Sequence, residues 1–117
     1  FIIYSIQNNL NKISTFLNFE GIPKYWSCEN FTRIGFLNDE YLNLTKLSFL
    51  NSCYEKIRIR EEIENEFCIS LTSFQINYSY GNCNFSEATI IMNQKRIVPL
   101  KINFSEAAIV KIIVWKK

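Results

Sequence analysis

Four cysteines constrain the fold of this chain more than any other feature of its sequence. Cys28, Cys53, Cys68 and Cys83 form an even set in 117 residues, with 24, 14 and 14 residues between them. These spacings match no Cys-x-x-Cys zinc or redox motif, so we expect two disulfides and no metal site. The sequence leaves three pairings open. A bridge from Cys68 to Cys83 would close a loop of about 15 residues, worth about 3 kcal/mol in the loop-entropy relation.

Five sequons for N-linked glycosylation accompany the cysteines. Random placement of the 14 asparagines and the 15 serines and threonines would give about two such motifs, so five is an excess. Glycosylation and disulfide formation both belong to the secretory pathway, and the two signals are chemically independent. The candidate glycosylation sites are Asn30, Asn43, Asn77, Asn84 and Asn103.

Composition adds a warning and two expected absences. Phe, Tyr, Met, Ile, Asn and Lys make up 58 of the 117 residues, which indicates an AT-rich genome and can itself generate sequons. The net charge of +2 provides no strong field for nucleic acid, so we expect no nucleic-acid partner. The longest strongly apolar stretch, Ala107–Trp115, has about nine residues, well short of a transmembrane segment.

Apolar periodicity predicts helices in the first half of the chain. Ile3, Ile6, Leu10, Ile13 and Leu17 recur in steps of three and four, which indicates an amphipathic helix that ends before Gly21 and Pro23. A second helix is expected directly after Asn38, an N-cap residue, with Asp39 and Glu40 in its first turn and its apolar pattern running through Ile57. The competing interpretation makes Lys56–Arg60 a strand with a basic face.

Strand patterns dominate the second half. Phe67, Ile69 and Leu71 alternate, and then residues 74–80 alternate in the opposite phase, which predicts a bulge or bend near Ser73. Gly81-Asn82 marks a turn, and further strands are expected at 89–92, 97–104 and 109–115. The chain therefore predicts a single domain, residues 1–117, with an α+β, β-rich fold. One or two N-terminal helices would pack on an antiparallel sheet or sandwich formed mainly by residues 67–116.

A short repeat links two of the sequons. Residues 84–91 and 103–110 share six of eight residues, and each copy is a sequon followed by an apolar run. One interpretation is that two equivalent loops enter neighbouring strands at the same end of a sheet, where their sugars would shield one rim. The other is coincidence under biased composition.

The residues that most enzymes need are missing. The chain has no histidine, which removes the commonest general base and metal ligand, and its three glycines cannot form a phosphate-binding loop. Glu61, Glu62, Glu64 and Glu66 follow three basic residues, so we interpret them as a solvated, charge-balanced turn or helix face. We expect no enzyme, no cofactor and no metal.

The sequence thus predicts a secreted or cell-surface, disulfide-stabilised glycoprotein domain that binds a protein partner without catalysis. That partner would be a receptor, another surface protein or a second copy, and its binding patch would lie away from Asn77, Asn84 and Asn103. Trp26 and Trp115 are expected in the core rather than as binding anchors. The alternative is a small structural subunit of an organellar or viral assembly whose cysteines remain free.

Overall fold

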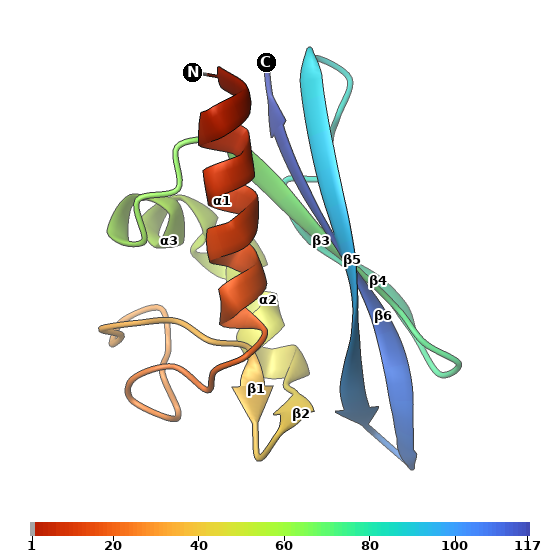
Figure 1. Ribbon diagram of the computed structural model, residues 1–117. Coiled ribbons are helices and arrows are strands. Elements are labelled where there is room, and N and C mark those ends of the chain that lie inside the picture. Colours follow the sequence, from red (N-terminus) through yellow and green to blue (C-terminus); the bar gives the residue numbers. More distant parts are fainter. Residues whose placement is uncertain (1) are drawn as a thin grey trace.

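The computed structural model describes residues 2–117 and confirms the α+β class, with an N-terminal helix packed on an antiparallel sheet (Figure 1). The helices precede all four strands of the larger sheet in the chain. The elements are α1 (Ile2–Phe16), β1 (Leu37–Asn38), β2 (Tyr41–Leu42), α2 (Leu44–Ser52), α3 (Tyr54–Arg60), β3 (Glu66–Thr72), β4 (Asn77–Gly81), β5 (Ile90–Lys101) and β6 (Ser105–Lys116).

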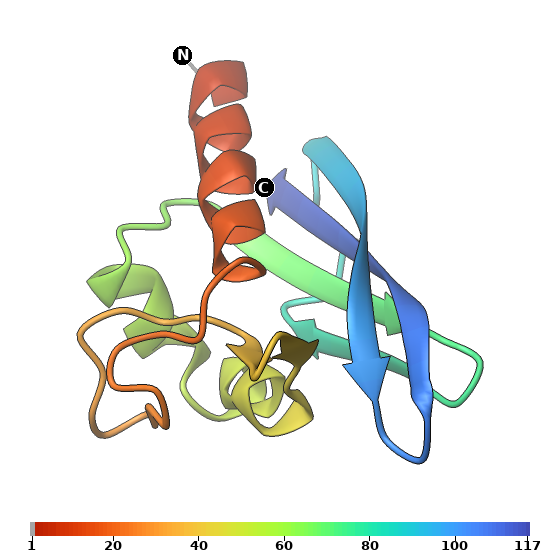
Figure 2. The ribbon, with the colours of Figure 1, turned by 60° about the horizontal axis from the view of Figure 1, so that its bottom comes forward.

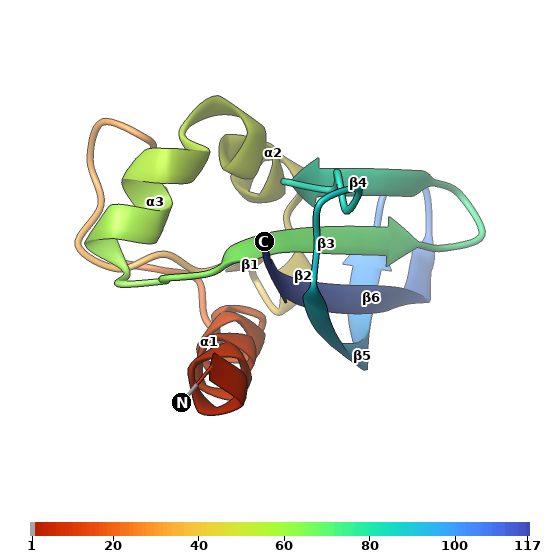
Figure 3. The ribbon, with the colours of Figure 1, turned by 90° about the horizontal axis from the view of Figure 1, so that it is seen from above.

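The larger sheet forms one layer and the helices form the other. Its strand order is β4-β3-β6-β5, all antiparallel, while β1 and β2 form a separate two-stranded hairpin. Views from below and above show all three helices on the same side of the larger sheet (Figures 2 and 3). The connection from β4 to β5 crosses the opposite face of the sheet, where its Cys83, Phe85 and Ala88 pack against residues of β3 and β6.

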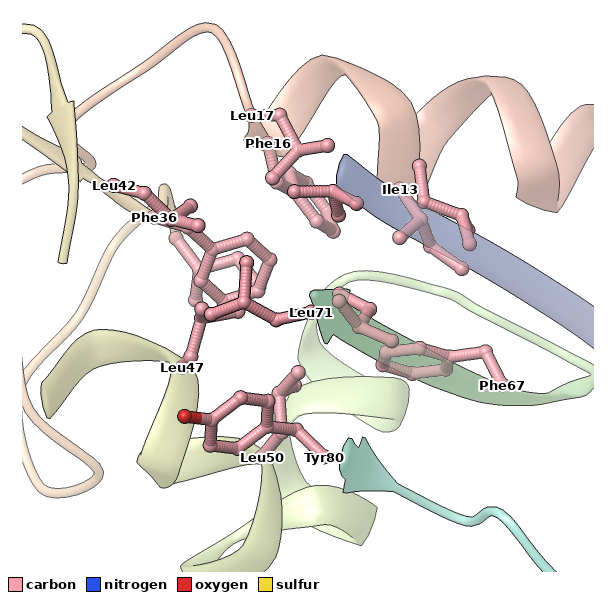
Figure 4. Packing of buried hydrophobic residues seen from close by; sticks show 14 of the residues in the cluster. Ile13, Phe16, Leu17, Phe36, Leu42, Leu47, Leu50, Phe67, Leu71 and Tyr80 are labelled. Atoms are coloured by element: carbon pink, nitrogen blue, oxygen red, sulfur yellow. The ribbon is translucent and has the colours of Figure 1, made fainter. Parts of the chain in front are cut away.

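Alternation along the strands places the core between the layers. Phe67, Ile69 and Leu71 of β3 point toward the helices, as do alternate residues of β6 from Ala108 to Val114. Figure 4 shows Phe67 and Leu71 of β3 among core residues of α1, α2 and the loops. The core residues labelled there are Ile13, Phe16, Leu17, Phe36, Leu42, Leu47, Leu50, Phe67, Leu71 and Tyr80.

Helix α1 follows its predicted amphipathic pattern, apart from its first turn. Ile6, Leu10 and Ile13 are buried against the sheet, whereas Ile3 is 66% exposed. Polar contacts fix the helix at its other end, where the Arg96 guanidinium on β5 donates to the Ser14 carbonyl at 2.5 Å. The predicted stop is also present, since α1 ends at Phe16, ahead of Gly21.

The second predicted helix begins later than expected and is broken. Asn38 is not its N-cap, because Asp39 and Glu40 adopt positive φ angles of 51° and 73° and form a tight hairpin turn between β1 and β2. Asn43 caps α2 instead, accepting a hydrogen bond from the Lys46 amide at 2.9 Å. Cys53 then leaves helical geometry and separates α2 from α3.

The alternative strand at Lys56–Arg60 is wrong, because these residues lie in α3. Near Ser73 the chain forms a complete turn between β3 and β4 rather than a bulge, and the Ser73 hydroxyl accepts hydrogen bonds from two turn amides. The expected strands at 89–92 and 97–104 belong to one long strand, β5, although Thr89 precedes it and residues 102–104 lie in the turn after it. Its polar middle, from Asn93 to Arg96, hid this continuity from the apolar pattern.

The structure also corrects the interpretation of the repeat. Asn84 precedes β5 and Asn103 precedes β6, but these strands are antiparallel, with Ile90 opposite Lys116 and Lys101 opposite Ser105. The two sequon loops therefore lie at opposite ends of the sheet and cannot shield a common rim. The two copies also enter their strands differently, since β5 begins at Ile90, well after Asn84, whereas β6 begins at Ser105, directly after the turn that contains Asn103.

Two disulfides are present, and no cysteine among residues 2–117 is free. Cys28–Cys53 joins the long loop after α1 to the junction of α2 and α3. Cys68–Cys83 joins β3 to the loop after β4, where Trp115 and Phe85 pack beside it on the helix-free face. Both tryptophans are buried, as expected, at 2% exposure for Trp26 and 1% for Trp115.

Candidate functional site

A chain of hollows runs along α1, and we call it the α1 furrow. Its largest part, about 390 Å³, lies between α1 and α3, and a second of about 290 Å³ continues beyond Lys12 toward the end of α1. A third, of about 240 Å³, opens near the start of the helix and shares Glu64 with the first. The central hollow is lined by Asn8, Lys12, Glu55, Arg58, Ile59, Glu62, Ile63 and Glu64.

The polar side of α1 forms one wall of the furrow because its apolar side faces the sheet. Asn8, Lys12 and Thr15 recur at helical spacing and line the hollows. Lys12 crosses to the other wall, where its ammonium donates to the Glu61 carbonyl at 2.8 Å. This contact divides the furrow into its two larger hollows without closing either.

The opposite wall is α3 and the segment that follows it. Arg58 is held there by ion pairs to Glu55 at 3.1 Å and to Glu66 at 2.7 Å, so its charge is largely neutralised. Glu62 and Glu64 are exposed and form no ion pair among the described residues. Ile59 is 74% exposed and presents an apolar side chain beside these carboxylates. The central hollow therefore has one more acidic than basic side chain and an accessible apolar surface. Over all three hollows the charges balance, with four acidic and four basic lining side chains.

Acidic and basic side chains are unevenly distributed along the chain, which the net charge does not reveal. Residues 20–66 contain nine acidic and six basic side chains, whereas residues 89–117 contain six basic and one acidic. The helical layer therefore has an excess of acid and the β5–β6 hairpin an excess of base. The net charge of +2 averages this separation away.

None of the sequon asparagines lines the furrow. Asn77 begins β4 and Asn103 occupies the β5–β6 turn, whereas Asn84 lies in the loop over the helix-free face. Asn30, in the loop that contains Cys28, is exposed like these three. Glycans on these sites would leave the furrow open.

Asn43 differs from the other sequon residues because it has a structural role. It is half-buried, and its side-chain oxygen caps α2. N-linked sugars attach to the amide nitrogen, so the capping oxygen would remain available in a glycosylated chain. All five glycosylation sites remain predictions.

A polar cluster supports the furrow from behind Arg58. The Tyr54 hydroxyl donates to Glu66 at 3.1 Å and accepts from the Phe67 amide at 2.9 Å, and the Asn82 side chain also donates to Glu66 at 2.8 Å. Burial raises the pKa of the Tyr54 phenol above its ordinary value of 10.0. This cluster ties α3 to β3 and keeps the furrow wall in place.

The raised pKa of Tyr54 predicts a loss of stability in alkaline solution. The unfolded chain gives up this proton at a lower pH than the folded protein, so the free energy of unfolding should fall as pH rises past about 10. Urea titrations across this range should show a shallower decline for Tyr54→Phe. Tyr25→Phe, at an exposed position, is the control and should follow the original protein. Parallel declines for all three proteins would contradict the prediction.

The sequence predicted none of the furrow as a site. Glu61, Glu62, Glu64 and Glu66 were expected to form a solvated, charge-balanced segment, yet only Glu66 pairs with a preceding base. The available signal was the polar stripe of α1, whose partner wall could not be identified without the fold.

Within residues 2–117, no group of three or more acidic or cysteine side chains could hold a metal ion, and no helix could span a membrane.

Comparisons with protein-family models, with curated proteins and with solved structures found no match to this chain.

Proposed function

We propose that this chain is a secreted or cell-surface glycoprotein domain that binds a protein partner through the α1 furrow and catalyses no reaction. The observation that carries the proposal is the furrow itself, an open and partly apolar surface without a sequon, whose central hollow has more acidic than basic side chains. A glycoprotein domain needs such a surface if a macromolecule is to approach closely. None of Asn77, Asn84 and Asn103 lines the furrow, which supports placing the binding patch there.

The two disulfides support the secretory part of the proposal. Such bonds persist in oxidising compartments and are rare in the cytosol. The alternative function, a structural subunit with four free thiols, disagrees with the paired cysteines of the structure. The test is to measure the intact mass of the protein before and after two treatments, reduction of disulfides and enzymatic removal of N-glycans. The mass changes show whether the protein passed through the secretory pathway. A bare mass with four free thiols would contradict secretion.

The chemistry of the furrow indicates the kind of segment it would bind. Glu62 and Glu64 favour lysine or arginine, while Ile59 favours an apolar side chain close to them. Helix α1 has 15 residues and is therefore about 22 Å long, which matches three to four turns of a partner helix. We propose a basic amphipathic helix as the bound element, in the manner of helix-in-groove recognition.

The binding test uses a defined probe because the natural partner is unidentified. The probe is a synthetic 14-residue helical peptide of lysine and leucine, titrated into the intact, disulfide-bonded protein while backbone amide shifts are recorded by NMR. Shifts should concentrate at α1, α3 and residues 61–65. The double variant Glu62→Lys, Glu64→Lys should weaken binding by about tenfold or more, since two attractive charges become repulsive.

A matched variant separates the furrow from general charge. Glu40→Lys with Glu87→Lys changes the net charge equally at exposed positions outside the furrow, so it should bind nearly as well as the original protein. Equal weakening by the two double variants would show nonspecific attraction. Shifts confined to the β5–β6 hairpin would place binding elsewhere and overturn the proposal.

A further inference from the structure

Among residues 2–117, the most exposed aromatic side chain lies at the far end of the sheet. Phe74, in the turn between β3 and β4, is 91% exposed. Phe104, in the turn between β5 and β6, is 48% exposed, and the two ring centroids lie 6.5 Å apart. Ile102, 42% exposed, adds to the same apolar end. Large apolar side chains that adjoin one another at the surface indicate a site that another group covers.

Polar contacts hold the two turns together and keep the aromatic pair on the surface. Glu106 accepts the Phe74 amide at 2.7 Å and also contacts the Gln75 side chain. Gln75 in turn accepts the Asn103 amide at 3.2 Å and donates to the Phe104 carbonyl at 3.4 Å. The hydrogen bond from Gln75 lowers the pKa of Glu106, which keeps this carboxylate charged. The aromatic pair is therefore fixed at the surface and cannot simply fold inward.

Asn103 stands in the middle of this apolar end. Asn103 is exposed and lies between Ile102 and Phe104 in the chain, and its sequon ends at Ser105. The bond from its own amide to Gln75 brings it beside the turn that carries Phe74. No other sequon asparagine has exposed apolar residues on both sides in the chain: Asn77, the nearest in sequence to Phe74, follows half-buried Ile76.

We propose that an N-linked glycan on Asn103 is the natural cover of Phe74 and Phe104, with its first sugar packed on the aromatic pair. The C–H face of a sugar ring is apolar and packs well on the face of an aromatic ring. Covalent attachment one residue from Phe104 keeps the sugar at high effective concentration, so even a weak contact is populated. This inference rests on the secretory placement in the proposed function, because only that pathway supplies the sugar.

The modification is a group transfer from a lipid-linked oligosaccharide pyrophosphate. The bond between the sugar C1 and the pyrophosphate oxygen breaks, the bond from C1 to Asn103 Nδ2 forms, and Nδ2 loses one proton. The lipid pyrophosphate leaves with the bonding electron pair. No redox partner is needed.

The test compares dye binding with glycan occupancy in protein secreted from eukaryotic cells. Peptide mass spectrometry should find Asn103 occupied. Asn103→Gln should raise the fluorescence of an apolar-surface dye severalfold, whereas Asn84→Gln, which removes a glycan elsewhere, should not. Adding Phe74→Ser to Asn103→Gln should return the signal to the original level. An endoglycosidase that leaves the first sugar in place should have little effect.

Each remaining outcome has a clear meaning. An unmodified Asn103 in a protein glycosylated at other sequons would overturn this inference alone, and so would equal dye binding by Asn103→Gln and Asn84→Gln. A secreted protein without any glycan would overturn it together with the glycoprotein part of the proposed function. Peptide binding at the furrow should be unchanged in Asn103→Gln, so the two proposals fail separately.

Discussion

Replacing Trp26 by alanine is expected to lower the free energy of unfolding by about 3–5 kcal/mol, the usual cost of removing a fully buried large aromatic side chain. Trp26 is 2% exposed and lies between Phe31 and Phe49, with ring centroids 5.7 Å and 5.0 Å away. Its indole N–H also donates to the Gly35 carbonyl at 2.7 Å. The alanine variant would lose the aromatic packing and would leave the buried Gly35 carbonyl without its hydrogen-bond donor.

The surrounding backbone is built around this side chain, so little relaxation can fill the cavity. Gly21 has φ of +94°, and a Cβ placed there would lie 2.5 Å from Trp26 Cδ1. Trp26→Phe keeps most of the volume but not the hydrogen bond, and it should cost clearly less than alanine. Urea unfolding followed by tyrosine fluorescence and circular dichroism measures both. A loss below about 1 kcal/mol for alanine would show that the loop is not part of the folded core.

Removal of the Cys28–Cys53 disulfide is expected to cost about 3.5 kcal/mol in the loop-entropy relation. The bridge spans a sequence separation of 25, and it attaches the long loop after α1 to the break between α2 and α3. For a chain of this size the loss corresponds to a melting temperature lower by about 14 °C. The double variant Cys28→Ser, Cys53→Ser, measured by scanning calorimetry, tests this value.

The second disulfide supplies the comparison. Cys68→Ser with Cys83→Ser opens a shorter loop, of separation 15, and should cost about 3 kcal/mol. Its bridge lies beside Trp115 and is flanked by two hydrogen-bonded strands, so far-ultraviolet circular dichroism should change little in this variant. If either double variant unfolds at the original temperature, that bridge does not form in the native protein.

Much of the fold followed from local patterns. The period of α1 and the alternation of β3 and β6 each place one face in the core, and the structure agrees because burial of that face dominates their energetics. The prediction of the second helix start was wrong, because a local side-chain preference for capping competed with the backbone geometry of a turn. Asn38 has the chemistry of an N-cap, but the hairpin turn formed by Asp39 and Glu40 takes precedence, and Asn43 caps the helix instead.

The disulfides were predictable as a class but not as pairs, since spacing alone allows three connectivities. The furrow was less accessible to sequence reasoning. Its two walls, α1 and the residues from Glu55 to Glu64, are separated by about 40 positions, and their approach depends on the packing of both on the sheet. Charge segregation was visible in the sequence, yet a whole-chain total averaged it away.

The placement of the two bridges has a mechanical consequence. Cys28–Cys53 lies wholly within the helical layer, and Cys68–Cys83 wholly within the sheet and its connection. Between the end of α3 and the start of β3, only residues 61–65 join the two cross-linked halves covalently. A pulling force applied at the two ends of the chain would therefore be resisted across the layer boundary by packing and hydrogen bonds alone. Because residues 2–27 and 84–117 lie outside both disulfide loops, α1 and β6 should separate first, while the two segments closed by the bridges stay cross-linked.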